Sequence, residues 1–280
     1  VSARRSPGWT VAPSAGLSSR AMLPTALAHG APPLAWPDVL LWLETVDALL
    51  RGFGHGLNNR ALALGATVES LDARRPLGSQ ATSALSREVQ RLTEQLRQLR
   101  QLPFSRELEP MPLLVADVVA TAVQLHRQHA VVGDVSCFAS GGSDTPPVLA
   151  GESAMVHALL VTLTGLKLFA GATGVVRITH APGPSSDGRD VLLRFVAERE
   201  AIVARSADPV RPEVLVRPAV VAAALLGPSK PTVTQRIEPA RAEVSWTLPS
   251  LREMRRRERE GATGATNATG ATNATNATNR

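Results

Sequence analysis

The sequence predicts an α+β protein in which an antiparallel helical hairpin is followed by a two-layer α/β sandwich. Two observations lead to this prediction. Between residues 37 and 104, apolar side chains recur every three or four positions, which is typical of paired amphipathic helices. From residue 110 to 251, short strand-like apolar runs alternate with helical stretches, which indicates helices packed on a sheet.

The composition excludes several classes of protein. Aromatic residues make up only 3% of the 280 residues and Tyr is absent, so an aromatic platform for nucleic-acid bases is not expected. The only cysteine is Cys137, which excludes a disulfide framework and a Cys-based zinc cluster. The net charge of +6 is modest and its cations are scattered. Apolar runs such as 218–227 are shorter than the roughly 20 residues that span a bilayer. We therefore expect a soluble, cytoplasmic protein without a nucleic-acid or membrane partner.

The two ends of the chain differ from the rest. Residues 1–36 contain no acidic residue and no periodic apolar pattern, so we expect a disordered lead-in. Residues 252–280 begin with alternating Arg and Glu and continue as repeats of Gly-Ala-Thr or Asn-Ala-Thr. Such small polar residues cannot offset the entropy lost on ordering, and we expect a basic, low-complexity, disordered tail.

The first helix is predicted to begin at Pro37-Asp38, because Pro is favoured near helix starts and Asp can cap them. Leucines then recur every seven residues, with Val and Phe at the intermediate positions. The members of this seam are Leu43, Val46, Leu50, Phe53, Leu57, Leu64 and Leu71. This 3-4 spacing is that of a coiled-coil seam.

A second helix follows the break at 74–78, and Pro103 ends it. Its seam consists of Leu85, Val89, Leu92, Leu96 and Leu99. Two such helices form an antiparallel hairpin whose seam is only half covered. A homodimer with a four-helix bundle would cover the seam, and packing on the downstream domain of the same chain is the alternative. We favour the dimer.

The sandwich is predicted to contain three helices and a mostly antiparallel sheet. The expected helices cover 113–129, 152–169 and 212–226, and the expected strands cover 131–139, 175–180, 191–197, 232–237 and 243–248. Residues 141–147 and 182–190 are expected to be loops, and Pro249 to end the last strand.

His55 is the candidate for chemistry on the first helix. It is two residues from Phe53 and from Leu57, so a 3.5-residue period places it on the outward face of the hairpin. Gly52, Gly54 and Gly56 surround it, although each glycine costs a helix about 1 kcal/mol relative to Ala. This pattern indicates close approach by a partner, or a bend. An exposed neutral imidazole is a competent nucleophile toward phosphorus.

The run His55-Gly56-Leu57-Asn58-Asn59-Arg60-Ala61-Leu62 resembles the phospho-acceptor box of two-component sensor histidine kinases, whose common form is His-Glu-Leu-Asn-Asn-Pro-Leu. The order of domains also resembles this family, with a dimerising and phospho-accepting hairpin at 37–104 and an ATPase-like sandwich at 110–251. The resemblance implies that His55 is the nucleophile and that Asn59 positions or hydrolyses the phosphoryl group. Asn58 and Arg60 would contact the partner or the phosphate, although Arg60 can equally be a solvated helix residue.

The sequence departs from the family's nucleotide-binding motifs. No Asn occurs between Asn59 and Asn267, and Thr164 stands where the family's magnesium-binding Asn is expected. No Gly occurs from 189 to 226, so the Asp-x-Gly-x-Gly turn and the Gly-rich lid are missing. Gly56 replaces the acidic residue that assists attack on ATP in this family. Autophosphorylation from ATP is therefore not expected.

An acceptor histidine beside a degenerate ATPase-like domain resembles the bacterial histidine phosphotransferases that are built on a kinase scaffold. This resemblance implies a phosphotransferase rather than an ATP-dependent kinase. Such a protein exchanges phosphoryl groups with receiver domains of response regulators and with an upstream hybrid kinase. The chain itself would bind no cofactor, and the receiver would supply its own Asp and Mg²⁺. Two alternatives are a non-catalytic pseudokinase scaffold that docks receivers or kinases, and an active sensor kinase with a divergent nucleotide site.

The remaining histidines are interpreted as structural. His126 and His129 are three residues apart on a predicted helix, but no acid or Cys stands at ligand spacing and we expect no zinc site. His157 lies in an apolar run and is expected to be half-buried. Cys137 is expected to be an inert core thiol.

Overall fold

The structure is a computed structural model that describes residues 35–69, 78–104, 110–184, 189–199, 213–229, 231–256 and 259. The expected lead-in up to residue 34, the expected break at 74–77 and the repeats after residue 260 lie outside the described residues.

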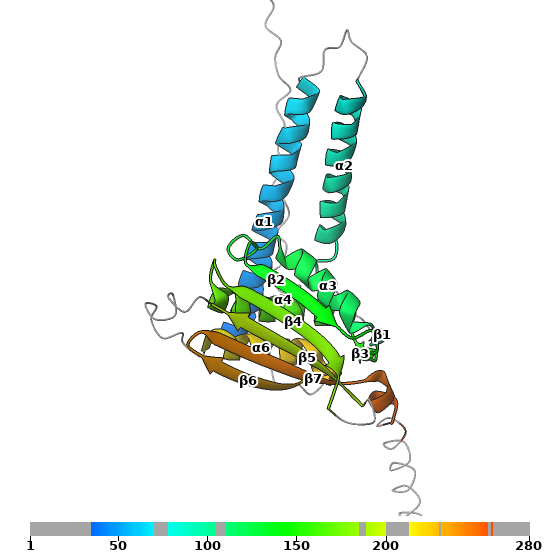
Figure 1. Cartoon of the computed structure of the whole chain (residues 1–280), viewed down its shortest axis with the longest axis vertical. Coiled ribbons are helices and arrows are strands. Elements are labelled where there is room, and N and C mark those ends of the chain that lie inside the picture. Colours follow the sequence, from blue (N-terminus) through cyan, green and yellow to red (C-terminus); the bar gives the residue numbers. More distant parts are fainter. Residues whose placement is uncertain are drawn as a thin grey trace, which may run out of the picture.

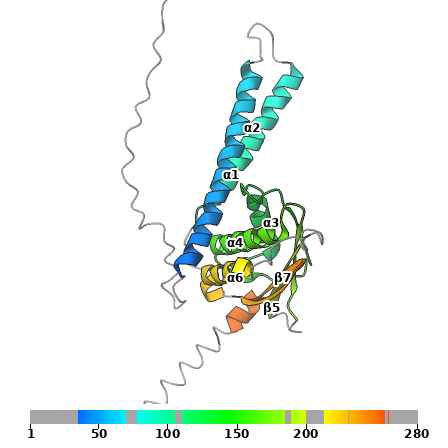
Figure 2. The same cartoon turned by 90° about the vertical axis from the view of Figure 1, so that its left-hand side faces the viewer.

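Two long helices form the predicted hairpin, α1 (Trp36–Glu69) and α2 (Ser79–Leu99). Helix α1 begins with Pro37 and Asp38 in its first turn, as the sequence predicts. The upper part of the hairpin projects away from the rest of the molecule, whereas the lower half of α1 runs along the helices of the second domain (Figures 1 and 2).

The second domain is a two-layer sandwich. Its elements are β1 (Met111–Leu113), α3 (Val115–His126), β2 (Ser136–Gly141), β3 (Val148–Ala150), α4 (Glu152–Ala170), β4 (Val175–Pro182), β5 (Asp190–Glu198), α6 (Glu213–Leu226), the short 3₁₀ helix η3 (Gly227–Ser229), β6 (Thr232–Glu238) and β7 (Arg241–Pro249). The main sheet has the order β2-β4-β5-β7-β6, with β2 and β4 parallel and the other neighbours antiparallel. Strands β1 and β3 form a separate two-stranded sheet. Helices α3, α4 and α6 cover one face of the main sheet (Figure 2).

Helix α4 is the centre of the core. Strands β5 and β7 alternate between buried and partly exposed residues, so one face of the sheet packs on the helices. Every residue of α4 from Met155 to Lys167 is buried. Among the described helices, α4 alone is long and apolar enough to cross a membrane, and 83% of that apolar window is buried inside the protein. We interpret α4 as the core helix of the sandwich.

Several element boundaries differ from the sequence prediction. The strand expected at 131–139 begins only at Ser136, because residues 130–134 form turns after α3. The helix expected at 113–129 is shorter at both ends, and Leu113 belongs to β1 instead. Strands β1 and β3 were not predicted, since three-residue strands are too short to show a period.

The expected disordered tail also begins too early, because residues 251–256 are helical. Ser250 Oγ accepts a hydrogen bond from the Glu253 backbone N–H at 3.3 Å. Ser250 and Glu253 have the spacing of a capping box, which is the sequence signal that predicts this helix start.

Helix α1 packs on the sandwich through a face that shares Phe53 with the predicted seam and otherwise lies beside it. Its buried residues are Trp42, Thr45, Ala48, Leu49 and Phe53. In contrast, the seam residues Leu43 and Leu50 are 38% and 48% exposed. The downstream domain therefore covers a neighbouring stripe of α1 and leaves these seam positions open.

Candidate functional site

The candidate site is the exposed face of α1 around His55. Residues His55 and Asn59 are one helical turn apart and both are exposed. The Asn59 Nδ2 atom lies 3.0 Å from His55 Nε2. An amide nitrogen can only donate, so this contact corresponds to the tautomer in which Nε2 accepts and Nδ1 carries the proton. The pair thus presents a fixed imidazole whose lone pair faces its amide neighbour.

Two of the three glycines near His55 are explained by contacts within the chain. A Cβ at Gly52 would lie 1.5 Å from the Gln128 carbonyl oxygen, and a Cβ at Gly56 would lie 2.6 Å from Gln95 Nε2. These glycines let the α3–β2 loop and helix α2 approach α1 closely. A Cβ at Gly54 would meet nothing within 4 Å, so this residue leaves open space beside His55.

Asn58 and Arg60 take different positions. Asn58 is exposed next to the His55–Asn59 pair. Arg60 is partly buried against α2, where its Nε donates to Gln95 Oε1 at 2.7 Å and its guanidinium lies 3.5 Å from Glu88. In the structure Arg60 therefore connects the two helices of the hairpin, one turn beyond Gly56.

Arg51 lies on the same face of α1 as His55, and the sequence did not single it out. It stands four residues before His55, so Arg51, His55 and Asn59 lie on one helical stripe. Its guanidinium pairs with Asp47 at 2.9 Å, and the two side chains are 66% and 62% exposed. An ion pair this exposed contributes little stability, so the guanidinium can pair with another anion instead. The i−4 spacing from the histidine is the signal that could have found it.

The sandwich contacts α1 immediately beside this stripe. The Ala130 backbone N–H donates to the Ala48 carbonyl at 3.1 Å, which ties the loop after α3 to the helix. Farther down α1, Trp42 Nε1 donates to His157 Nδ1 at 3.1 Å, and His157 Nε2 donates to the Leu102 carbonyl at 2.9 Å. His157 is thus fully buried rather than half-buried, and it joins the hairpin to the core helix.

Thr164, which stands where the family's magnesium-binding Asn is expected, forms hydrogen bonds within the core. Thr164 Oγ1 donates to the Leu160 carbonyl at 3.0 Å and accepts from His126 Nε2 at 3.0 Å. The His126 and His129 rings stack with their centroids 5.0 Å apart. Burial holds the pKa of His126 well below its usual value and lowers the pKa of His129 to about 4. Within the described residues, no group of three His, Cys, Asp or Glu side chains could hold a metal ion.

Cys137 lies on β2 and is partly buried. Burial raises the pKa of its thiol, which lowers the thiolate fraction and with it the reactivity. This agrees with the expected inert thiol.

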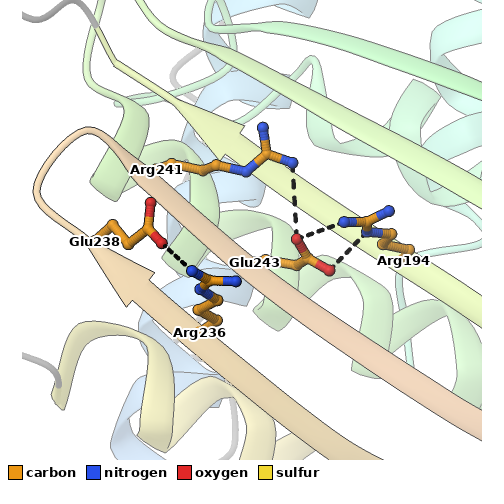
Figure 3. Close-up of a pocket in the computed structure, with 5 residues that line it drawn as sticks. All are labelled: Arg194, Arg236, Glu238, Arg241 and Glu243. Carbon is orange, nitrogen blue, oxygen red and sulfur yellow. Dashed lines mark hydrogen bonds and ion pairs between the residues drawn. The ribbon is translucent and has the colours of Figure 1, made fainter.

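The exposed face of the main sheet carries a ladder of ion pairs around a shallow pocket (Figure 3). Arg194 binds Glu243 through two bonds of 2.6 and 2.7 Å, and Arg241 lies between Glu243 and Glu198. Arg236 pairs with Glu238 at 2.8 Å. Since these charges neutralise one another, we interpret the ladder as the solvated outer face of the sheet.

Comparison with known proteins gives solved structures only. No protein-family model matches the sequence, and no curated protein matches it. The chain is similar to the Acinetobacter baumannii histidine kinase AdeS, at 15% identity over 70% of this chain and 98% of that one, with a TM-score of 0.38. It is similar to the catalytic domain of histidine kinase ThkA, at 9% identity over 51% of this chain and 97% of that one, with a TM-score of 0.39. It is also similar to a bacterial phosphotransferase, at 12% identity over 78% of this chain and all of that one, with a TM-score of 0.38.

Proposed function

We propose that this chain is a histidine phosphotransfer protein of a two-component phosphorelay, which exchanges phosphoryl groups with receiver domains of response regulators through His55. An upstream hybrid kinase would supply the phosphoryl group through its own receiver domain, and we expect the exchange in the cytoplasm. The observation that carries the proposal is the exposed His55 ring, whose unprotonated Nε2 accepts a hydrogen bond from Asn59 at 3.0 Å.

The proposed transfer uses the Nε2 lone pair of His55. This nitrogen attacks the phosphorus of an aspartyl phosphate on the receiver, so a P–N bond forms while the P–O bond to the aspartate breaks. The aspartate carboxylate leaves with the bonding electron pair, and the ring keeps its proton on Nδ1. The Asn59 amide releases its hydrogen bond to His55 Nε2 and donates to a phosphoryl oxygen instead. Arg51 neutralises negative charge on the transferred phosphoryl group. The receiver supplies the aspartate and the Mg²⁺.

Two observations support transfer without ATP. Helix α4 buries every residue from Met155 to Lys167 against the rest of the molecule, so this stretch offers no surface to a nucleotide. Thr164 is buried and uses its hydroxyl proton and one lone pair for hydrogen bonds within the core, so it is a poor substitute for an exposed magnesium ligand. The missing glycines between 189 and 226 support the same proposal from the sequence.

The packing of the sandwich on α1 supports a scaffold role for the second domain. A sensor kinase must bring bound ATP to its histidine, which requires the two domains to move. Here the Trp42–His157–Leu102 bonds and the Ala130–Ala48 bond fix the sandwich on the lower half of α1. The exposed stripe of Arg51, His55 and Asn59 is left for another protein.

The exposed seam supports a homodimer. Apolar seam residues remain accessible on both helices of the hairpin, namely Leu43, Leu50, Val89 and Leu96. A second copy that pairs its hairpin with this one would bury them in a four-helix bundle.

The test is phosphotransfer from a receiver. A purified receiver with labelled phosphate on its aspartate is mixed with the full chain, with His55→Ala, and with Arg87→Ala as an exposed control on α2. We expect acid-labile label on the wild-type chain and on the control, and none on His55→Ala. If several receivers transfer no label and lose their phosphate no faster, the chain is a scaffold and not a phosphotransferase.

A further inference from the structure

The helix at 251–256 lies at the end of the sandwich that is opposite the hairpin tip (Figure 1). A basic groove lies beside this helix. It has a volume of about 550 Å³, within the roughly 300–1,000 Å³ range of ligand sites. Five of its nine lining residues are arginines and one is acidic. The lining residues are Pro146, Pro147, Arg189, Leu251, Arg252, Glu253, Arg255, Arg256 and Arg259. The His55 site does not include any of them.

The walls of the groove are held together by backbone hydrogen bonds. The Leu251 N–H donates to the Pro147 carbonyl at 2.8 Å, and the Ser250 N–H donates to the Arg189 carbonyl at 2.7 Å. Ser250 also forms a β-bridge with Val148 and caps the helix that follows. The groove is thus preformed, with the proline loop, the start of β5 and the C-terminal helix fixed to one another.

Two of the groove's arginines, Arg252 and Arg255, carry the charge that is available to a ligand. Its one acid, Glu253, is buried and accepts two hydrogen bonds from Arg256 at 2.8 and 2.9 Å. Arg252 and Arg255 are exposed, and neither forms a hydrogen bond or ion pair with another described residue. Guanidinium groups pair with carboxylates through two parallel bonds, so these side chains favour an anionic ligand of defined geometry.

The floor of the groove is apolar. Pro146, Pro147 and Leu251 lie among the arginines, and all three are partly buried. A ligand that suits both parts carries carboxylates for the rim and an apolar side chain for the floor. None of the lining residues is aromatic, so the groove offers no stacking surface for bases. A concave shape also fits an extended peptide better than it fits a flat lipid surface.

We propose that this groove binds an acidic peptide segment of another protein, with an apolar side chain placed between its carboxylates. The chain's own long termini do not fit, because residues 1–34 and 261–280 contain no Asp or Glu. The site is a second docking surface, and it does not depend on phosphotransfer through His55.

The test is fluorescence anisotropy of a labelled peptide, six residues long, that alternates Glu or Asp with Leu, titrated with the full chain. The variant Arg252→Glu/Arg255→Glu reverses two charges in the groove, and Arg87→Glu/Arg91→Glu reverses two exposed charges on α2 as the matched control. Since charge-assisted hydrogen bonds to Arg are stronger than neutral ones, we expect at least a tenfold loss of affinity in the groove variant and less than a threefold loss in the control. Thermal melts of both variants check that the fold is kept.

Three results would overturn the proposal. The first is an equal loss in the two variants, which means that only net charge matters. The second is unchanged binding when Gly replaces Leu in the peptide, since the apolar floor would then have no role. The third is tighter binding of a duplex DNA or of vesicles with anionic lipid than of the peptide, which would assign the groove to a different class of partner.

Discussion

The Trp42 indole donates a hydrogen bond to His157 Nδ1 over a distance of 3.1 Å, and this bond joins the hairpin to the core helix of the sandwich across 115 residues of sequence. Phe104 packs edge-on against both rings, with centroid distances of 5.9 Å to Trp42 and 5.3 Å to His157. The placement of α1, and with it that of His55, thus depends on a buried polar bond within an aromatic cluster.

Replacing Trp42 with Phe is expected to destabilise the chain. The variant keeps an aromatic ring but leaves His157 Nδ1 buried without its donor, which costs about 1–3 kcal/mol. Urea unfolding measures the change, with Trp36→Phe as the control because Trp36 is 65% exposed. Equal stability of the two variants would show that the Trp42–His157 bond does not hold the domains together.

The buried histidines predict a loss of stability in mild acid. Burial lowers the pKa of His157 and of His129 to about 4, and it holds the pKa of His126 well below its usual value. Between an unfolded pKa near 6.5 and a folded pKa near 4, the unfolded chain binds more protons, so stability falls as the pH falls. Each histidine contributes at most about 1.4 kcal/mol per pH unit in this window.

Urea unfolding at pH 7, 6, 5 and 4 measures this slope. Glu94 adds to this slope only below about pH 5, because hydrogen bonds from Arg97 and Gln98 lower the pKa of its carboxyl to about 2 in the folded chain while the unfolded carboxyl binds protons there. The slope between pH 7 and 5 therefore reports the histidines. In the His157→Gln variant, the slope of the unfolding free energy against pH should be smaller by the contribution of one histidine. A stability that is flat from pH 7 to 4 would contradict the burial of these rings as neutral groups.

The glycines of α1 predict opposite effects for the same substitution. Gly52→Ala places a methyl group 1.5 Å from the Gln128 carbonyl, so the loop after α3 must move and the chain is destabilised. Gly54→Ala meets no atom within 4 Å and gains about 1 kcal/mol from helix propensity. Thermal melts of the two variants measure the difference, and a stabilised Gly52→Ala would refute the close contact.

The exposed seam predicts that Leu50→Glu prevents dimer formation. The side chain is 48% exposed in the single chain, so the substitution should not disturb the fold of the protomer. In a bundle it would bury a charge at the interface, which is strongly unfavourable. Sedimentation velocity measures the oligomeric state, with Glu44→Gln as an exposed control on the same helix. A wild-type chain that sediments as a monomer at high concentration would rule out the proposed bundle.

The sequence predicted the hairpin, the order of the longer sandwich elements and the outward position of His55, because each depends on a local period or on a single helical spacing. It did not predict the face of α1 that packs on the sandwich. The residues Trp42, Thr45 and Leu49 have a helical spacing of their own, next to the leucine seam, and only the three-dimensional contact selects between the two stripes.

The contacts of Gly52 and Gly56 could not be predicted from the sequence either. Their partners, Gln128 and Gln95, stand 76 and 39 positions later in the chain, and no local pattern indicates which element will approach a helical glycine. The C-terminal helix is a different case, since Ser250 and Glu253 form a capping signal that is visible in the sequence.

The stripe of α1 predicts separate roles for Asn59 and Arg51 in phosphotransfer. Asn59→Ala removes the donor that holds Nε2, so the transfer rate from a phosphorylated receiver should fall, and any hydrolysis of the phosphohistidine should slow. Arg51→Ala removes a cation four residues before His55, and we expect about a 10- to 100-fold slower transfer through lost charge stabilisation. Arg51→Lys should restore part of the rate, because lysine keeps the positive charge. The recovery is partial because lysine lacks the planar guanidinium that can form two parallel hydrogen bonds. Rapid-quench kinetics with the Arg87→Ala control measure these rates, and wild-type transfer in Arg51→Ala would remove Arg51 from the site.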